Sequence, residues 1–111
     1  MPQKNPARPQ PSTQPEAPVT RPAWTFLTNH AQVLLVIAQD QRVTAKAIAS
    51  QVGVTERAVQ RILADLESAG YISRTRDGRQ NLYEIHAHMP MRHPAQRGHA
   101  VRELFALLSH Q

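Results

Sequence analysis

The chain has 111 residues, enough for one small domain, and it has no cysteine, which excludes disulfides, cysteine-ligated zinc and thiol catalysis. The net charge is +5 and the sequence pI about 10.8, a balance typical of proteins that meet nucleic acid or an anionic membrane. The longest apolar run, Val33 to Ala38, is far shorter than the ~20 residues of a membrane-spanning helix, and the N-terminus lacks the apolar core of a signal peptide. We therefore expect a soluble, cytoplasmic protein.

The first 22 residues differ in composition from the rest of the chain. They hold seven of the nine prolines, together with glutamine, serine and threonine. Such a segment buries too little apolar surface to offset the entropy lost on ordering it, and proline removes backbone donors. We expect residues 1–22 to form a disordered tail and residues 23–111 to form the folded domain.

Two helices are expected at the start of the folded domain. The first begins at Thr28 or Asn29, either of which can cap it, and runs through Gln39. The second follows Thr44 and stops at Gly53, which is free to take a positive φ. Three apolar residues precede the first helix and are expected to be buried: Trp24, Phe26 and Leu27.

A third helix and a β-hairpin follow. Thr55 can cap this helix and Gly70 ends it. Residues 71–76 are expected to form a strand, Asp77-Gly78 a hairpin turn and residues 80–86 the return strand. The helix has an apolar stripe at i, i+3, i+4 and i+7, made of Val59, Ile62, Leu63 and Leu66.

A last helix is expected over about residues 96–109, after a loop that contains two prolines. Three helices and a hairpin need only part of its apolar surface to complete a core. This surface therefore either joins two subunits or folds back onto the core of its own chain. Its stripe consists of Val101, Leu104, Phe105 and Leu108, with Leu107 beside it.

The short link between the second and third helices points to a particular fold. Only residues 53–55 separate the two helices, which forces a sharp angle between them, as in a helix-turn-helix. Four residues match the spacing of that motif: Ala49, Gly53, Val59 and Ile62. The longer string VTERAVQRILADLESAGYISRTRDGRQNLYEI resembles bacterial winged-helix transcriptional regulators of the MarR and ArsR kind, and the resemblance covers about residues 33–85. It implies a mostly α, α+β fold: a winged helix-turn-helix with a three-helix core, a β-hairpin wing and a C-terminal helix.

The same resemblance implies that the third helix enters the major groove of double-stranded DNA. With the apolar stripe against the core, the other side of this helix faces outward. Arginine can bind guanine and glutamine can bind adenine through two hydrogen bonds, and the first turn of a helix can bind a phosphate. The residues predicted to read DNA are Thr55, Arg57, Ala58, Gln60 and Arg61.

Arginines also surround the predicted hairpin turn, or wing, which the resemblance places on the neighbouring DNA backbone or minor groove. Arg74 and Arg76 are two residues apart and share a strand face, and Arg79 lies near the tip. The guanidinium group suits phosphates and narrow minor grooves. Lys46 is a further candidate for a phosphate contact, and Arg42 is a weaker one.

An ordinary solvated surface is the simpler explanation for some of these arginines. Arg61 and Asp65 are four residues apart on the third helix and can pair with each other. Between residues 54 and 85 five arginines meet five acidic residues, so any case for DNA rests on placement rather than on total charge. The alternative function is a winged-helix module that binds an acidic protein partner. Two sets of arginines on one side of a tight topology favour DNA.

Metal binding and catalysis find little support in the sequence. His86 and His88 have the spacing of one strand face, but no histidines lie at i, i+4 within a helix as in many zinc sites. No Ser-His-Asp set, carboxylate pair or phosphate-binding loop is evident. We expect no metal, no cofactor and no enzyme activity. The six histidines are His30, His86, His88, His93, His99 and His110.

The sequence therefore predicts a transcriptional regulator that binds DNA sequence-specifically as a homodimer. In the regulators that it resembles, terminal helices join two subunits, so the resemblance favours the stripe of Val101, Leu104, Phe105 and Leu108 as the dimer interface. A two-fold dimer presents two recognition helices one DNA turn apart, ~34 Å, on an inverted repeat. Occlusion of a promoter makes repression the expected outcome.

Overall fold

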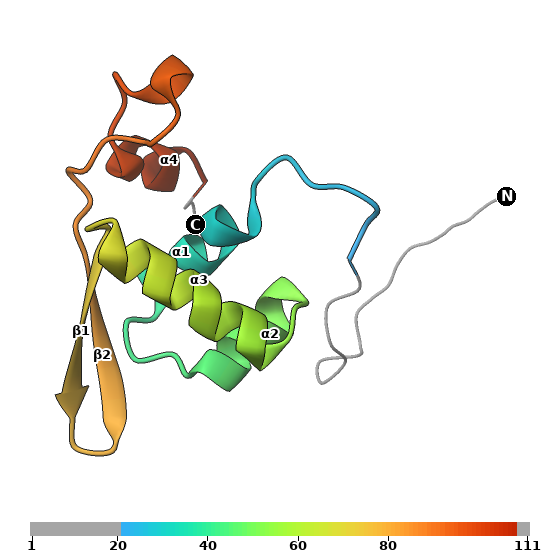
Figure 1. The fold of residues 1–111 in the computed structure, drawn as a ribbon, viewed down its shortest axis with the longest axis vertical. Coiled ribbons are helices and arrows are strands. Elements are labelled where there is room, and N and C mark those ends of the chain that lie inside the picture. Colours follow the sequence, from blue (N-terminus) through green and yellow to red (C-terminus); the bar gives the residue numbers. More distant parts are fainter. Residues whose placement is uncertain (1–20, 109–111) are drawn as a thin grey trace, which may run out of the picture.

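The computed structural model describes residues 21–108, and within this range the chain forms four α-helices, a β-hairpin and a 3-10 turn (Figure 1). The elements are, in chain order, α1 (Asn29–Gln39), α2 (Ala45–Val52), α3 (Glu56–Ser68), β1 (Ile72–Asp77), β2 (Gln80–Ile85), the 3-10 turn η2 (Pro94–Gln96) and α4 (Val101–Leu108). The predicted element order is confirmed, and the fold is a winged helix. The tail predicted over residues 1–22 lies, apart from its last two residues, outside the described range.

Threonine begins each of the first three helices. The hydroxyls of Thr28, Thr44 and Thr55 accept hydrogen bonds from the amides three residues later, at 3.1, 3.0 and 3.0 Å. Each bond satisfies a donor that the first turn leaves unpaired, and such a cap contributes about 1 kcal/mol. Of the two predicted caps for α1, Thr28 is the one that forms.

The end of α3 determines where the hairpin begins. Gly70 has a φ of +88°, its amide donates to the carbonyl of Glu67, and the amide of Tyr71 donates to the carbonyl of Leu66. This pair of bonds is a Schellman motif, in which glycine takes the left-handed position without strain. Tyr71 thus belongs to the helix end, and β1 begins at Ile72, one residue later than predicted.

The hairpin loop consists of Gly78 and Arg79. Asp77, predicted to lie in the turn, instead forms the last pair of the ladder with Gln80. Gly78 has a φ of +66°, which suits the first position of a two-residue hairpin loop. β2 ends at Ile85, one residue before its predicted end.

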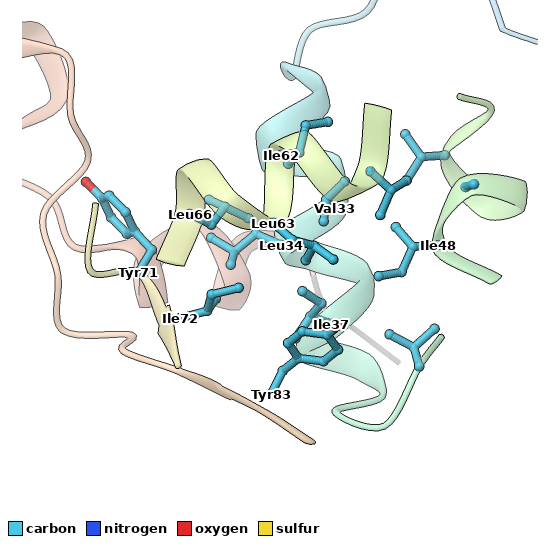
Figure 2. Packing of buried hydrophobic residues seen from close by; sticks show 14 of the residues in the cluster. Val33, Leu34, Ile37, Ile48, Ile62, Leu63, Leu66, Tyr71, Ile72 and Tyr83 are labelled. Atoms are coloured by element: carbon cyan, nitrogen blue, oxygen red, sulfur yellow. The ribbon is translucent and has the colours of Figure 1, made fainter. Parts of the chain in front are cut away.

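The core lies between the first three helices and the inner face of the hairpin (Figure 2). All four residues of the predicted stripe of α3 are buried in it: Val59, Ile62, Leu63 and Leu66. The hairpin contributes Ile72 and Tyr83, both almost fully buried. Because the core takes up one whole side of α3, the opposite side of this helix is left for solvent or a partner.

The expectation that the residues before α1 are buried is wrong for two of the three. Trp24 is 69% exposed and Phe26 is 92% exposed, whereas Leu27 is half-buried. The core is already filled by side chains of the helices and the hairpin, so the two rings contact each other instead, edge to face with centroids 5.0 Å apart. A hydrogen bond of 2.7 Å from Arg21 Nη1 to Asn29 Oδ1 holds this segment against the start of α1.

The last helix begins later than predicted. Its expected start lay near residue 96, but only a 3-10 turn forms there, and α4 begins at Val101. Ala100 pairs with Pro90 in an isolated β-bridge, so its backbone is extended where a helix was expected. The Glu103 carboxylate then caps α4 by accepting a hydrogen bond from the Ala100 amide at 2.9 Å. The predicted end at Ser109 lies outside the described residues.

Candidate nucleic-acid interface

The side of α3 opposite the core carries the residues predicted to meet DNA. Thr55, Arg57, Gln60 and Arg61 are exposed, and Ala58 is half-buried. Arg57, Gln60 and Arg61 are three and four residues apart, so they lie on neighbouring turns of one helix face. Two guanidinium groups and a carboxamide on this face have the donors and acceptors that the edges of guanine and adenine require.

Neither arginine of this face is neutralised by a nearby acid. Asp65, which the sequence offered as a partner for Arg61, instead contacts α1: its Oδ2 lies 2.8 Å from Nε2 of His30. Among residues 21–108, Arg57 and Arg61 take part in no salt bridge. Both guanidinium groups are therefore available to a base or a phosphate.

The first turn of α3 adds neutral donors to the same surface. The Thr55 hydroxyl accepts from the Ala58 amide, so its own hydrogen can still be donated. The backbone amides of Glu56 and Arg57 lie in the first turn of α3, where an amide has no carbonyl partner within the helix. Such a turn favours an anion, although the carboxylate of Glu56 occupies part of the surroundings.

The three arginines of the wing have different surroundings. Arg74 Nη2 lies 3.0 Å from Glu67 Oε1 in the last turn of α3, and the Arg74 side chain is only 27% exposed. Arg76 Nη1 donates across the hairpin to Asn81 Oδ1 at 3.3 Å. Arg79 is exposed in the loop and forms no salt bridge with any described residue. Arg79 is thus the wing arginine most open to a phosphate, whereas Arg74 braces the hairpin against α3.

Two basic residues outside α3 and the wing have distinct positions. Lys46 is exposed in the first turn of α2. Arg42, in the loop between α1 and α2, reaches the wing: its Nη1 lies 2.7 Å from Asp77 Oδ2 and 3.3 Å from Gln80 Oε1. Sequence reasoning missed this contact, because no local pattern indicates a bond between residues 38 positions apart.

His86 has a structural role, because both nitrogens of its ring contact groups of the protein. His86 Nδ1 lies 2.8 Å from the carbonyl oxygen of Gly70, and its Nε2 lies 2.8 Å from Ser73 Oγ. A carbonyl only accepts, so Nδ1 carries a hydrogen and donates it, and both ring nitrogens are engaged. His88 lies beside it, with the ring centroids 6.4 Å apart, but the described residues contain no group of three His, Asp or Glu placed to hold a metal ion.

The apolar stripe of α4 is divided between the core and the surface. Val101 is 4% exposed and belongs to the core, and Leu104 and Phe105 are half-buried. Leu107 is 76% exposed and Leu108 39% exposed. A cavity of about 420 Å³ lies between the start of α1, the end of α3 and α4. Of the two roles predicted for this stripe, packing onto the core of its own chain therefore explains Val101. It does not explain Leu107 and Leu108.

Comparison with protein-family models identifies the family. The model of the MarR family matches residues 20–80, which is more than half of the chain. The chain belongs to the MarR family. The match spans the three helices of the core and all of β1, and therefore includes every residue that α3 exposes toward a partner.

Membership of the MarR family confirms the resemblance found in the sequence and the winged-helix fold. Regulators of the MarR family control transcription by binding DNA rather than by catalysis. Comparison with curated protein sequences gives no match. None of the helices within residues 21–108 is both long and apolar enough to cross a membrane.

Proposed function

We propose that this MarR-family protein recognises a specific double-stranded DNA sequence, with α3 in the major groove and the hairpin on the adjacent backbone. The observation that carries the proposal is the pair Arg57 and Arg61, exposed on one face of α3 and without an ion pair among the described residues. In this assignment Arg57, Gln60 and Arg61 read base edges. Thr55 contacts a phosphate, and Ala58 lies close to the bases without hydrogen-bonding them.

The wing and α2 supply phosphate contacts in this proposal. Arg79 has the most open position and Arg76 lies beside it on the hairpin, so both are assigned to the flanking backbone or the minor groove. Arg74 belongs to the same set but acts partly through its ion pair with Glu67. Lys46 is assigned to a phosphate, since an exposed lysine in the first turn of a helix can reach the DNA backbone without sequence preference.

A homodimer that binds an inverted repeat completes the proposal. Exposed large apolar side chains are candidates for an interaction surface. Within residues 21–108 the large apolar side chains that are exposed come from the segment before α1 and from α4: Trp24, Phe26, Leu107 and Leu108. Leu104 and Phe105 keep part of their surface for a second copy, whereas Val101 is used in the core. Two-fold symmetry would set the recognition helices ~34 Å apart.

Repression is the outcome that we propose for binding. A dimer bound through the residues assigned above would cover a stretch of promoter that RNA polymerase needs. The site of action would be the cytoplasm, where bacterial promoter DNA is found.

Selection from a random duplex library tests the proposal directly. The full chain is purified, bound to the library at moderate salt, and the retained DNA is sequenced. Enrichment of an inverted repeat with half-sites about one helical turn apart is the expected result. Retention of all duplexes alike, lost as salt rises, would contradict sequence-specific reading. No retention at any salt would favour an acidic protein as the partner of the same arginines.

A further inference from the structure

Arg42 joins the body of the protein to the far end of the wing. Its Nη1 lies 2.7 Å from Asp77 Oδ2 and 3.3 Å from Gln80 Oε1. Asp77 and Gln80 form the last pair of the hairpin ladder, directly on either side of the two-residue loop. One guanidinium group thus holds both residues that flank the wing loop.

The loop that carries Arg42 is itself anchored on two sides. The Arg42 amide donates to Asp40 Oδ1 at 3.0 Å, which ties it to the end of α1. The amide of Tyr83 donates to the carbonyl of Gln41 at 3.0 Å, which ties the neighbouring residue to the middle of β2. Because Tyr83 is buried in the core, this bond ties the loop to the folded body, and Arg42 reaches the wing from there.

The outer part of the hairpin has little else to hold it. Burial falls along β1 from Ile72, which is buried, to the exposed residues 75–77. The far end of the hairpin extends away from the helices (Figure 1). A two-stranded hairpin without a packed face is only marginally stable in water. Beyond the core, therefore, the contacts made by Arg42 are a main restraint on the position of the loop that carries Arg79.

The contact between Arg42 and Asp77 also changes the charge beside the wing loop. The carboxylate of Asp77 directly precedes the wing loop, where a phosphate is expected to approach. An unpaired carboxylate there would repel the phosphate, whereas a carboxylate 2.7 Å from a guanidinium is largely neutralised. Arg42 is thus placed both to position the wing loop and to mask its one acidic neighbour on β1.

We propose that Arg42 is a positioning residue for DNA binding, which acts through Asp77 rather than by contacting DNA itself. The inference rests on the proposed function, since it assumes that the wing loop and Arg79 meet the DNA backbone. It differs from the prediction from sequence, which makes Arg42 a weaker candidate for a direct phosphate contact. If Arg42 acts through Asp77, its contribution to DNA affinity should depend on the Asp77 carboxylate. If Arg42 contacts a phosphate directly, its contribution should not depend on that carboxylate.

A double-mutant cycle separates these roles. Affinity for the selected duplex is measured for the wild type, Arg42→Ala, Asp77→Asn and the double variant. Arg42→Ala is expected to lower affinity about three- to fivefold when Asp77 is present, which is the range an exposed ion pair can supply. With Asn at position 77 the same change should cost less than about twofold, because no carboxylate then needs to be masked. An equal loss in both backgrounds, or no loss in either, overturns the proposal.

Two further measurements keep the result independent of folding. The thermal midpoint of Arg42→Ala should match the wild type, because an exposed ion pair contributes little to stability. Without DNA, the ¹⁵N heteronuclear NOE of the Gly78 and Arg79 amides should fall in this variant while that of the α3 amides stays constant. An unchanged NOE at both loop residues would contradict the positioning role.

Two reference variants distinguish failure of the inference from failure of the proposed function. Arg97→Ala removes an exposed arginine that directly follows η2. The segment that contains η2 lies at the opposite end of the molecule from the wing loop (Figure 1), so this variant should change affinity less than about twofold. Arg79→Ala should weaken binding. If it does and Arg42→Ala does not, only the inference fails. If Arg79→Ala also binds like the wild type, the assignment of Arg79 to a phosphate fails and the inference with it, whereas a wild-type chain that selects no duplex overturns the proposed function itself.

Discussion

The imidazole Nε2 of His30 lies 2.8 Å from the Asp65 carboxylate, so the acid nearest to Arg61 along α3 contacts α1. Asp65 is the acidic residue of α3 at helical spacing from Arg61. Because Asp65 is bound to α1 instead, the guanidinium of Arg61 keeps its charge and its donors free of acids within the described residues. The same contact ties the C-terminal half of α3 to α1.

Replacement of Arg57 or Arg61 by alanine should impair base reading. If either residue binds a guanine edge, the change is expected to cost about 1–3 kcal/mol of binding free energy and to relax specificity at one position of the site. Fluorescence anisotropy with the selected duplex and with single-base variants measures both quantities. An equal loss on every duplex would instead show that the residue contacts a phosphate.

Replacement of Arg79 by alanine should weaken binding to all sequences by a similar factor. Because a phosphate contact releases counterions, the slope of log K against log salt should decrease by about one. Arg74→Ala should change this slope less, since the Arg74 guanidinium is already paired with Glu67 at 3.0 Å. Binding isotherms over a salt series decide between these cases, and equal slopes for the two variants would contradict the distinction.

The parts of this fold that the sequence predicts well depend on neighbouring residues. Threonine caps, the apolar stripe of α3 and the glycine that ends this helix are set by bonds within about one helical turn, so a local pattern contains the information. The outward direction of Arg57, Gln60 and Arg61 follows from the same stripe. The assignment of these three residues to DNA rests on their residue types and their exposure, and not on an observed contact with DNA.

The parts that the sequence does not predict depend on contacts between distant residues. The exposure of Trp24 and Phe26 results from competition for a core that other elements fill. The late start of α4 results from pairing between Ala100 and Pro90. Contacts such as that of Arg42 with the wing join positions far apart in the chain, and periodicity within one element holds no information about them.

Gly70→Ala should destabilise the fold through its backbone. Gly70 has a φ of +88°, and an alanine there is expected to cost about 1–2 kcal/mol, the difference between left- and right-handed backbone for a residue with a Cβ. Steric conflict contributes little, since an added Cβ would lie 3.7 Å from Met89 Cε. Gly98→Ala is the matched control, because an added Cβ there meets nothing within 4 Å. Urea denaturation should show a loss for the first variant alone, and equal losses would contradict the role of φ.

The stabilisation that Glu103 provides should depend on pH. The hydrogen bond with the His99 ring, and then that from the Ala100 amide, lower the pKa of Glu103 below its ordinary value of 4.5. Its contribution is therefore fully present above the ordinary value and is lost as the pH falls through the lower value of the folded chain. Glu103→Gln should reduce the free energy of unfolding at pH 7, and the difference should shrink below about pH 4. A difference that stays constant down to pH 2 would contradict this origin.

Leu107→Glu should convert the proposed dimer into a monomer. Leu107 is 76% exposed on α4, so a charge there leaves the core intact but opposes burial against a second copy. Ala106→Glu, at the exposed neighbouring residue, adds the same charge and should leave the dimer in place. Sedimentation velocity measures the state of each protein, and a monomeric wild type would contradict the proposal. Trp24, the single tryptophan of the chain, gives a second test: if its segment joins the interface, its emission should shift to shorter wavelength with rising wild-type concentration but not in Leu107→Glu.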